Sequence, residues 1–158
     1  MRADSVGERR DSTFVGASVR RRVRAPIDRV YAAWVDPALM ARCMGIKAIT
    51  DVSGPLDRPG TTFTEVVFGP YRSRSEVLVA EPPALHDMTG RNFLGLGYRW
   101  TTRFTRADEG TEVTLEAEAI LPGLLGRLFR RSLAGGAMER GVERRLALFA
   151  GLVEAGTT

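Results

Sequence analysis

A change of periodicity divides the chain and limits the folds it can adopt. Between Thr13 and Leu121, most segments alternate apolar and polar residues with period two, which indicates strands. From Pro122 to about Glu154, apolar residues recur every three to four positions instead, which predicts an amphipathic helix of about thirty residues, roughly 45 Å long. Gly135-Gly136 interrupts this helix, so we expect a bend or a close approach to a sheet there.

The strand-like segments come in a definite order. The first strand ends at Ala25-Pro26, and two short helices follow, separated by Asp36-Pro37. Six further strands come next, and the turn at residues 108–110 joins the last two as a hairpin. The order predicts an α+β fold in which a seven-stranded, curved antiparallel sheet wraps around the long C-terminal helix. We expect a single domain over residues 13–155, preceded by a disordered tail over residues 1–12.

Composition excludes several function classes. The chain has 158 residues with 44% hydrophobic and 27% charged content, which is ordinary for one globular domain. No apolar run approaches the roughly 20 residues of a membrane span, and the N-terminus lacks the apolar core of a signal peptide. The single cysteine, Cys43, excludes an internal disulfide and a cysteine-based metal site. We therefore expect a cytoplasmic protein without metal, other cofactor or stable membrane insertion; its oligomeric state is not readable.

The net charge of +4 does not indicate a nucleic-acid partner. Lys47 is the only lysine, and the many arginines are spread along the chain among acidic residues. The densest group, at residues 20–24, falls on a predicted strand where alternate residues face solvent. We expect no nucleic-acid binding.

Four segments are informative together: APIDRVYAAWVDP, EVLVAEPPAL, YRWTTRFTRADEGTEVTLEAEA and LLGRLFRRSLAGGAMERGVERRLALFAGLVE. They resemble the START-like (SRPBCC) superfamily, whose members have the helix-grip fold, and within it the polyketide cyclase/dehydrase-like group. The resemblance covers about residues 13–155 and carries no catalytic signature. It implies a cavity between sheet and helix that binds a small hydrophobic ligand. Many relatives have a tryptophan in the second short helix, where this chain has Cys43.

The stretch LHDMTGRNFLGLGYRW contains the only histidine, His86, beside Asp87. Adjacent strand residues point to opposite faces, so these two side chains cannot form a dyad in one site. If Leu85 faces inward, Asp87 does too, and a carboxyl in an apolar cavity acquires a raised pKa suited to acid–base catalysis. The GLG segment is followed by a strand rather than a helix, so it is not a phosphate loop.

Alternation assigns the residues that we expect to face the cavity. Val77 and Val79 place Ser73 and Ser75 inward, whereas the face of the strand that contains Glu65 is ambiguous. The candidate catalytic residues are Asp87 and Tyr98. The candidate ligand-binding residues are Tyr31, Trp34, Ser73, Ser75, Trp100, Thr102, Phe104, Leu115, Met138 and Val142.

Two functions compete on this basis. One is an enzyme, a cyclase, dehydratase or aromatase that acts on a polyketide-like intermediate. The other is a non-catalytic carrier or sensor of a lipid or other apolar metabolite. A membrane-surface role for LLGRLFRRSL is a third, weaker hypothesis, because the helix-grip arrangement accounts for the apolar face of that segment.

Overall fold

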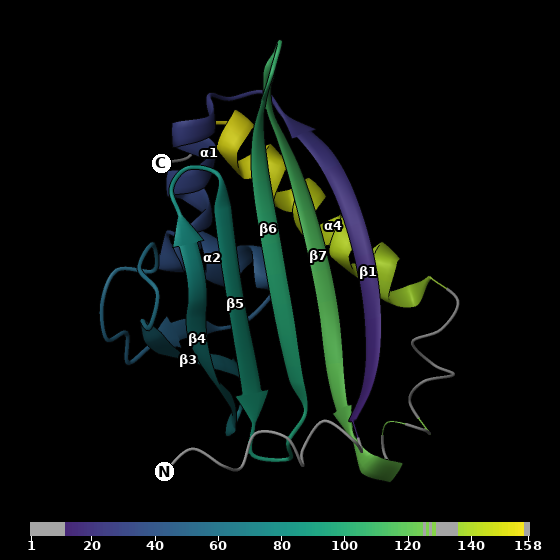
Figure 1. Ribbon diagram of the computed structural model, residues 1–158. Coiled ribbons are helices and arrows are strands. Elements are labelled where there is room, and N and C mark those ends of the chain that lie inside the picture. The colour runs from purple at the N-terminus through teal and green to yellow at the C-terminus, as the bar shows by residue number, and fades with distance from the viewer. Residues whose placement is uncertain (1–11, 125, 127, 129–135, 157–158) are drawn as a thin grey trace.

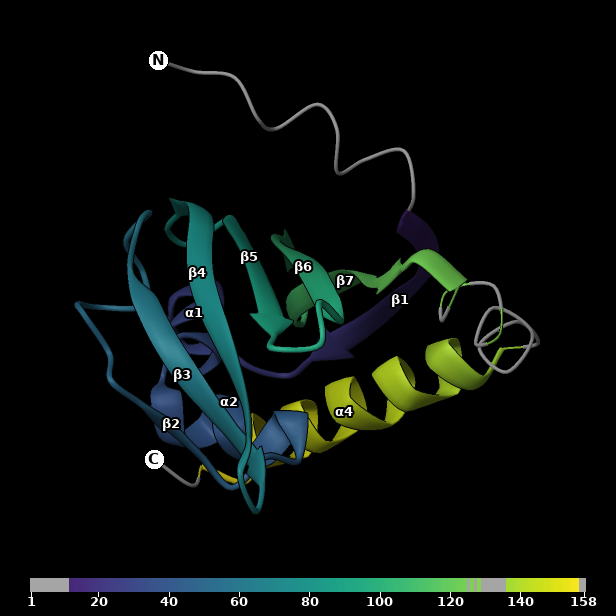
Figure 2. The same ribbon diagram turned by 90° about the horizontal axis from the view of Figure 1, so that it is seen from below.

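A seven-stranded antiparallel sheet forms the body of the protein, as the alternating segments predict. The computed structural model describes residues 12–124, 126, 128 and 136–156. The strands pair in the order β1-β7-β6-β5-β4-β3-β2, and the curved sheet arches over helix α4 (Figures 1 and 2). The strands are β1 Ser12–Val23, β2 Ala48–Thr50, β3 Thr62–Phe68, β4 Tyr71–Glu81, β5 Leu85–Asn92, β6 Gly97–Ala107 and β7 Gly110–Pro122.

Two short helices follow β1, α1 (Ile27–Trp34) and α2 (Pro37–Met44). The carboxylate of Asp36 accepts a hydrogen bond of 2.8 Å from the backbone N–H of Leu39, which caps the start of α2. Gly45 ends α2 in the left-handed conformation, with φ 68°. The local signals at Asp36-Pro37 and Gly45 therefore fix this helical pair.

The described part of the C-terminal region is helical on both sides of the glycine pair. Helix α4 (Ala137–Glu154) has 18 residues, and Gly136 precedes it in the left-handed conformation, with φ 78°. Pro122, where the periodicity places the start of the helix, is the last residue of β7. Helical backbone follows directly, at Gly123, Leu124, Gly126 and Leu128, and α4 begins after Gly136. Residues 125, 127 and 129–135, which include most of LLGRLFRRSL, lie outside the described residues.

The apolar core lies between the inner face of the sheet and the helices. Phe149 of α4 packs edge to face against Trp34 of α1, with ring centroids 5.0 Å apart. Trp34 also contacts the ring of Phe104 on β6, at 6.1 Å. One face of α4 is buried against this core through Val142, Leu146, Phe149, Ala150 and Val153.

A β-bulge interrupts β4 and corrects one predicted orientation. Val77 pairs with Met88, but Val79 pairs with Asp87, so the register shifts between them by the one extra residue, Leu78. The prediction that Val77 and Val79 share a face is therefore wrong. The bulge leaves Ser73, Ser75 and Val77 on the inner face and turns Val79 to the outer face.

No helix in the described part of the chain is both long and apolar enough to cross a lipid bilayer. Strand β1 begins at Ser12, so the predicted tail lies outside the described residues except for its last residue.

We expect Phe149→Ala to lower the free energy of unfolding by about 3–5 kcal/mol, because it removes a large side chain from a packed interior. Urea unfolding measures this change. Leu148→Ala is the matched control, since Leu148 is 48% exposed and Phe149 is 2% exposed. A loss for Leu148→Ala as large as that for Phe149→Ala would contradict the packing described.

Candidate functional site

Three neighbouring strands bring a serine, a glycine and a tyrosine into one row on the inner face. Ser75 on β4 pairs with Gly90 on β5, and Gly90 pairs with Tyr98 on β6. A Cβ atom on Gly90 would lie 2.5 Å from Ser75 Oγ and 2.7 Å from Tyr98 Cζ. The Tyr98 ring therefore occupies the space that a side chain at position 90 would fill.

A buried carboxyl lies beside this row, on β3, two positions from Phe63, the residue that pairs with Ser75. Glu65 of β3 is 3% exposed and accepts a hydrogen bond of 3.0 Å from Ser75 Oγ and another from the Tyr98 hydroxyl. The hydroxyl oxygens of Ser75 and Tyr98 are themselves 3.1 Å apart. We call Glu65, Ser75 and Tyr98 the carboxyl–phenol cluster.

Burial sets the protonation of this cluster. It raises the pKa of Glu65, and the hydrogen bonds from Tyr98 and Ser75 and the charge of Arg145 oppose that rise. Burial also raises the pKa of Tyr98 well above 10.0, and the neighbouring Glu65 charge adds to the effect. The cluster therefore combines a carboxyl that takes up a proton readily with a phenol that remains protonated.

Helix α4 contributes a cation to the same region. The guanidinium carbon of Arg145 lies 5.4 Å from the centroid of the Trp100 ring, in a cation–π contact. Burial lowers the pKa of Arg145, while the charge of Glu65 raises it. Arg145 therefore places positive charge near the cluster although its side chain is partly exposed.

The side chain of His86 lies on the inner face of the sheet, and that of Asp87 lies on the outer face. Asp87 lies on the outer face with Arg99, whose Nη2 donates to Asp87 Oδ2 at 2.6 Å and whose Nε donates to Oδ1 at 3.1 Å. The sequence leaves open which of His86 and Asp87 faces the interior, and the structure selects His86, because the inward residues of β5 are His86, Met88 and Gly90. Asp87 is thus engaged in an ion pair away from the carboxyl–phenol cluster.

His86 is completely buried and makes one hydrogen bond, of 3.0 Å, between Nε2 and the Leu56 carbonyl. A carbonyl only accepts, so Nε2 carries the hydrogen. Burial lowers the pKa of His86, against the raising effects of this bond and of the Asp57 and Asp87 charges. The ring is therefore neutral, and Nδ1 presents a lone pair to the interior.

An enclosed apolar pocket lies between α1, α2, the sheet and α4. Its volume is about 10 Å³, enough for about one water molecule. Burial raises the pKa of Cys43 to about 11, so this thiol is protonated and serves as a small apolar side chain. The pocket is lined by Trp34, Met40, Cys43, Met44, Met88, Trp100 and Phe149.

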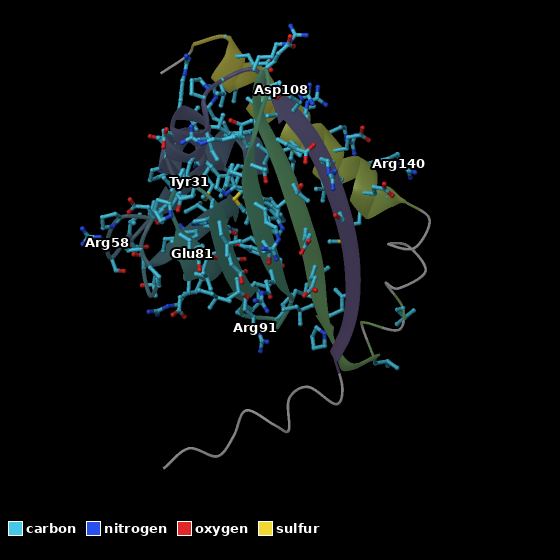
Figure 3. All side chains as sticks on the ribbon, turned by 45° about the horizontal axis from the view of Figure 1, so that its top comes forward. Tyr31, Arg58, Glu81, Arg91, Asp108 and Arg140 are labelled. Carbon is cyan, nitrogen blue, oxygen red and sulfur yellow. The ribbon has the colours of Figure 1, made fainter. Side chains whose placement is uncertain are left out.

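Most predicted ligand-binding residues are buried, but they do not form one site. Ser75 and Tyr98 belong to the carboxyl–phenol cluster, and Ser73 pairs with Glu65 in the sheet. Trp34 and Trp100 line the enclosed pocket, and Thr102 pairs with His86. The remaining candidates, Tyr31, Phe104, Leu115, Met138 and Val142, belong to the core or pack against it. In Figure 3, Tyr31 lies where α1 meets the sheet, whereas Arg58 and Arg91 lie at the periphery.

Sequence reasoning missed Glu65, His86 and Arg145. The alternation of β3 fits either face, and the signal that resolves it is the inward pair Ser73 and Ser75 on the adjacent strand. No local signal places Arg145, because its position depends on how α4 crosses the sheet. Among the residues that the structure describes, no three histidine, cysteine, aspartate or glutamate side chains are grouped so as to hold a metal ion.

Comparison with known proteins shows the family of this chain and the solved structures that share its fold. The family described as polyketide cyclase/dehydrase and lipid transport matches residues 15–154. No curated protein matches the sequence significantly.

Several solved structures share the fold. A Staphylococcus aureus protein of unknown function has a TM-score of 0.70 at 13% identity, covering 92% of this chain and 97% of its own. Norcoclaurine synthase from Thalictrum flavum has a TM-score of 0.63 at 11% identity, covering 96% and 93%. DynU16, from the dynemicin biosynthetic locus, has a TM-score of 0.64 at 20% identity, covering 89% of this chain and 48% of its own.

Gly90→Ala tests the packing of the carboxyl–phenol cluster. The added methyl group overlaps the Tyr98 ring, so we expect the free energy of unfolding to fall by about 1–3 kcal/mol. Urea unfolding reports the change. Gly141→Ala on α4 is the control, because a Cβ atom added there would meet no neighbouring side chain within 4 Å, and it should leave stability unchanged or raised. Equal stability of Gly90→Ala and the wild type would show that the ring moves aside freely.

Glu65→Gln tests the raised pKa of Glu65. The folded protein binds the Glu65 proton more tightly than the unfolded chain does. The contribution of Glu65 to the free energy of unfolding therefore falls as the pH rises from 4.5 through the folded pKa of Glu65. The free energy of unfolding of the wild type, minus that of Glu65→Gln, should therefore decrease over this range. Unfolding curves from about pH 4 to about pH 8 measure it. A difference that is constant with pH would contradict the raised pKa.

Proposed function

The chain belongs to the polyketide cyclase/dehydrase and lipid transport family, and on this premise we propose that it binds an apolar small molecule between the sheet and α4 and moves protons on it. The observation that carries this proposal is the carboxyl–phenol cluster. Burying a carboxyl so that it is 3% exposed is costly, and its hydrogen bond to a tyrosine beside the apolar core indicates a chemical role rather than a packing role.

The reaction class is ring closure and dehydration of a poly-β-keto compound. In ring closure, a base removes a proton from a carbon between two carbonyls, and that carbon bonds to a ketone carbon whose oxygen then takes up a proton. In dehydration, a further carbon-bound proton is removed, and the hydroxyl leaves with a proton as water. Neither step changes the overall oxidation state, so one carboxyl that alternately accepts and returns a proton serves both. Glu65 is that group.

Tyr98 and Arg145 have complementary roles in this proposal. The Tyr98 phenol remains protonated, so it donates a hydrogen bond to the substrate oxygen on which negative charge develops. The Arg145 guanidinium, held over Trp100, stabilises the same charge electrostatically. The Tyr98 hydroxyl is half-buried, where such an interaction is stronger than in water, whereas Arg145 acts from a position exposed to solvent.

A carrier remains the second candidate function. The enclosed pocket has an apolar, sulfur-containing lining that suits storage of an apolar ligand without chemistry, provided that its methionines rearrange, because its volume of about 10 Å³ holds about one water molecule. The family description names lipid transport as well as cyclisation. Norcoclaurine synthase, a synthase with this fold, and DynU16, from a biosynthetic locus, support the enzyme.

A β-hydroxyketone with a naphthyl group is a suitable test substrate, because its dehydration gives a conjugated enone that absorbance detects. We expect the wild type to accelerate this reaction and Glu65→Gln to be slower by about 10²–10⁴-fold. Binding of the substrate, measured by naphthyl fluorescence, should change little. Glu76→Gln is the matched control, since this exposed acid lies on the neighbouring strand β4.

The two candidate functions predict different results. A wild type that binds the naphthyl compound without turnover would favour the carrier. Turnover that survives Glu65→Gln would show that another group transfers the proton.

A further inference from the structure

A second group of buried polar atoms lies apart from the carboxyl–phenol cluster. Five buried side-chain atoms in the described part of the chain have no hydrogen-bond partner. Folded proteins pair nearly all such atoms, and each unpaired one lowers stability. We call them the inner polar group: Tyr31 Oη, Trp34 Nε1, Asp57 Oδ1, His86 Nδ1 and Thr102 Oγ1.

The members of the inner polar group lie in one region. His86 and Thr102 are paired residues of β5 and β6 on the inner face, and both are completely buried. Leu56, which holds His86 Nε2, directly precedes Asp57. The Asp57 charge acts on both Tyr31 and His86.

Aromatic contacts place the helix residues in the same region. The rings of Tyr31 and Trp34 lie 5.3 Å and 6.1 Å from that of Phe104. Phe104 follows Thr102 by two residues on the same face of β6. The inner polar group is therefore assembled from α1, the loop before β3, β5 and β6.

The group combines donors and acceptors. Tyr31, Trp34 and Thr102 each have a hydrogen to donate. The neutral ring of His86 offers a lone pair, and so does the carboxyl oxygen of Asp57. Burial raises the pKa of Tyr31 to about 12, with a further rise from the Asp57 charge, so its hydroxyl keeps its hydrogen. A ligand hydroxyl donates one hydrogen bond and accepts two, which matches such a mixed set.

Apolar surface separates the inner polar group from the carboxyl–phenol cluster. Thr102 and Tyr98 are four positions apart on β6, a span of about 13 Å along the strand. Met88 and Trp100 form the pair between them and line the enclosed pocket, as does Trp34. The pocket also includes Met40 and Met44, and methionine side chains rearrange readily to admit an apolar body.

We propose that the inner polar group binds a hydroxyl group of the ligand, and that the ligand is an elongated apolar molecule with oxygen substituents at both ends. This inference rests on the proposed function for the existence of an internal ligand. Two hydrogen bonds of about 2.8 Å each take up part of the span of about 13 Å between the two polar groups. The length that remains suits two fused aromatic rings with oxygens at opposite ends.

The test compares a naphthalene diol, with hydroxyls at opposite ends, with the corresponding naphthol. Intrinsic fluorescence of the probes measures both dissociation constants. For the wild type, we expect the diol to bind about tenfold more tightly. In Tyr31→Phe and Thr102→Val, the advantage of the diol should disappear while the naphthol still binds.

Thr111→Val is the matched control for Thr102→Val. Both threonines are completely buried, but Thr111 Oγ1 donates to the Ala25 carbonyl at 2.8 Å. Without probe, Thr111→Val should be less stable than the wild type, whereas Thr102→Val and Tyr31→Phe should be as stable or more so. Thr111→Val should retain the preference for the diol.

Three outcomes would overturn the inference. If diol and naphthol bind the wild type equally, ligand binding stands but the inner polar group is not its second contact. If Thr102→Val and Tyr31→Phe lose stability as Thr111→Val does, these hydroxyls already hold an enclosed water. If neither probe binds, the internal ligand itself is contradicted, and the proposed function fails with the inference.

Discussion

The edge-to-face contacts of Trp34 with Phe149 and Phe104 connect the three parts of the molecule that form its interior. Trp34 lies on α1, Phe149 on α4 and Phe104 on β6, so these contacts join both helices to the sheet. The apolar inner face of an antiparallel sheet must be shielded from water, and these ring contacts attach the two covering helices to it. The placement of Arg145 depends on the same attachment, since it lies on α4 one turn before Phe149.

The covered face is not uniformly apolar, and its polar positions follow the geometry of the sheet. Paired residues on adjacent strands lie side by side, so Ser75, Gly90 and Tyr98 meet although they are far apart in sequence. Glu65 lies on the next strand, β3, and its carboxyl accepts two hydrogen bonds from protein hydroxyls in place of bonds from water. Burial without an ion pair would be costly for a carboxylate, and the protonated form avoids that cost. The chemistry proposed for Glu65 is thus a consequence of where β3 lies.

The fold was largely predictable, because period two and the turn residues depend only on neighbours in sequence. Those patterns located the strands and the inward orientation of Ser75, Trp100 and Thr102. They failed where orientation depends on pairing across strands. The bulge at Leu78 reversed the phase within β4, and the double proline before β5 left the phase of His86 and Asp87 undetermined. The predicted start of the C-terminal helix was one residue early, because Pro122 still belongs to β7. The carboxyl–phenol cluster was only half predictable, since Glu65 could be assigned inward only once the β3–β4 register was known.

The absent side chain at position 90 links two positions that are eight residues apart in sequence. Because the Tyr98 ring fills the space of a Cβ at position 90, a larger residue at one position requires a smaller residue at the other. Sequence divergence in this protein's lineage is therefore constrained at both positions together. A glycine on β5 paired with a tyrosine on β6 becomes a criterion for sorting related sequences into those that retain the buried phenol and those that have lost it.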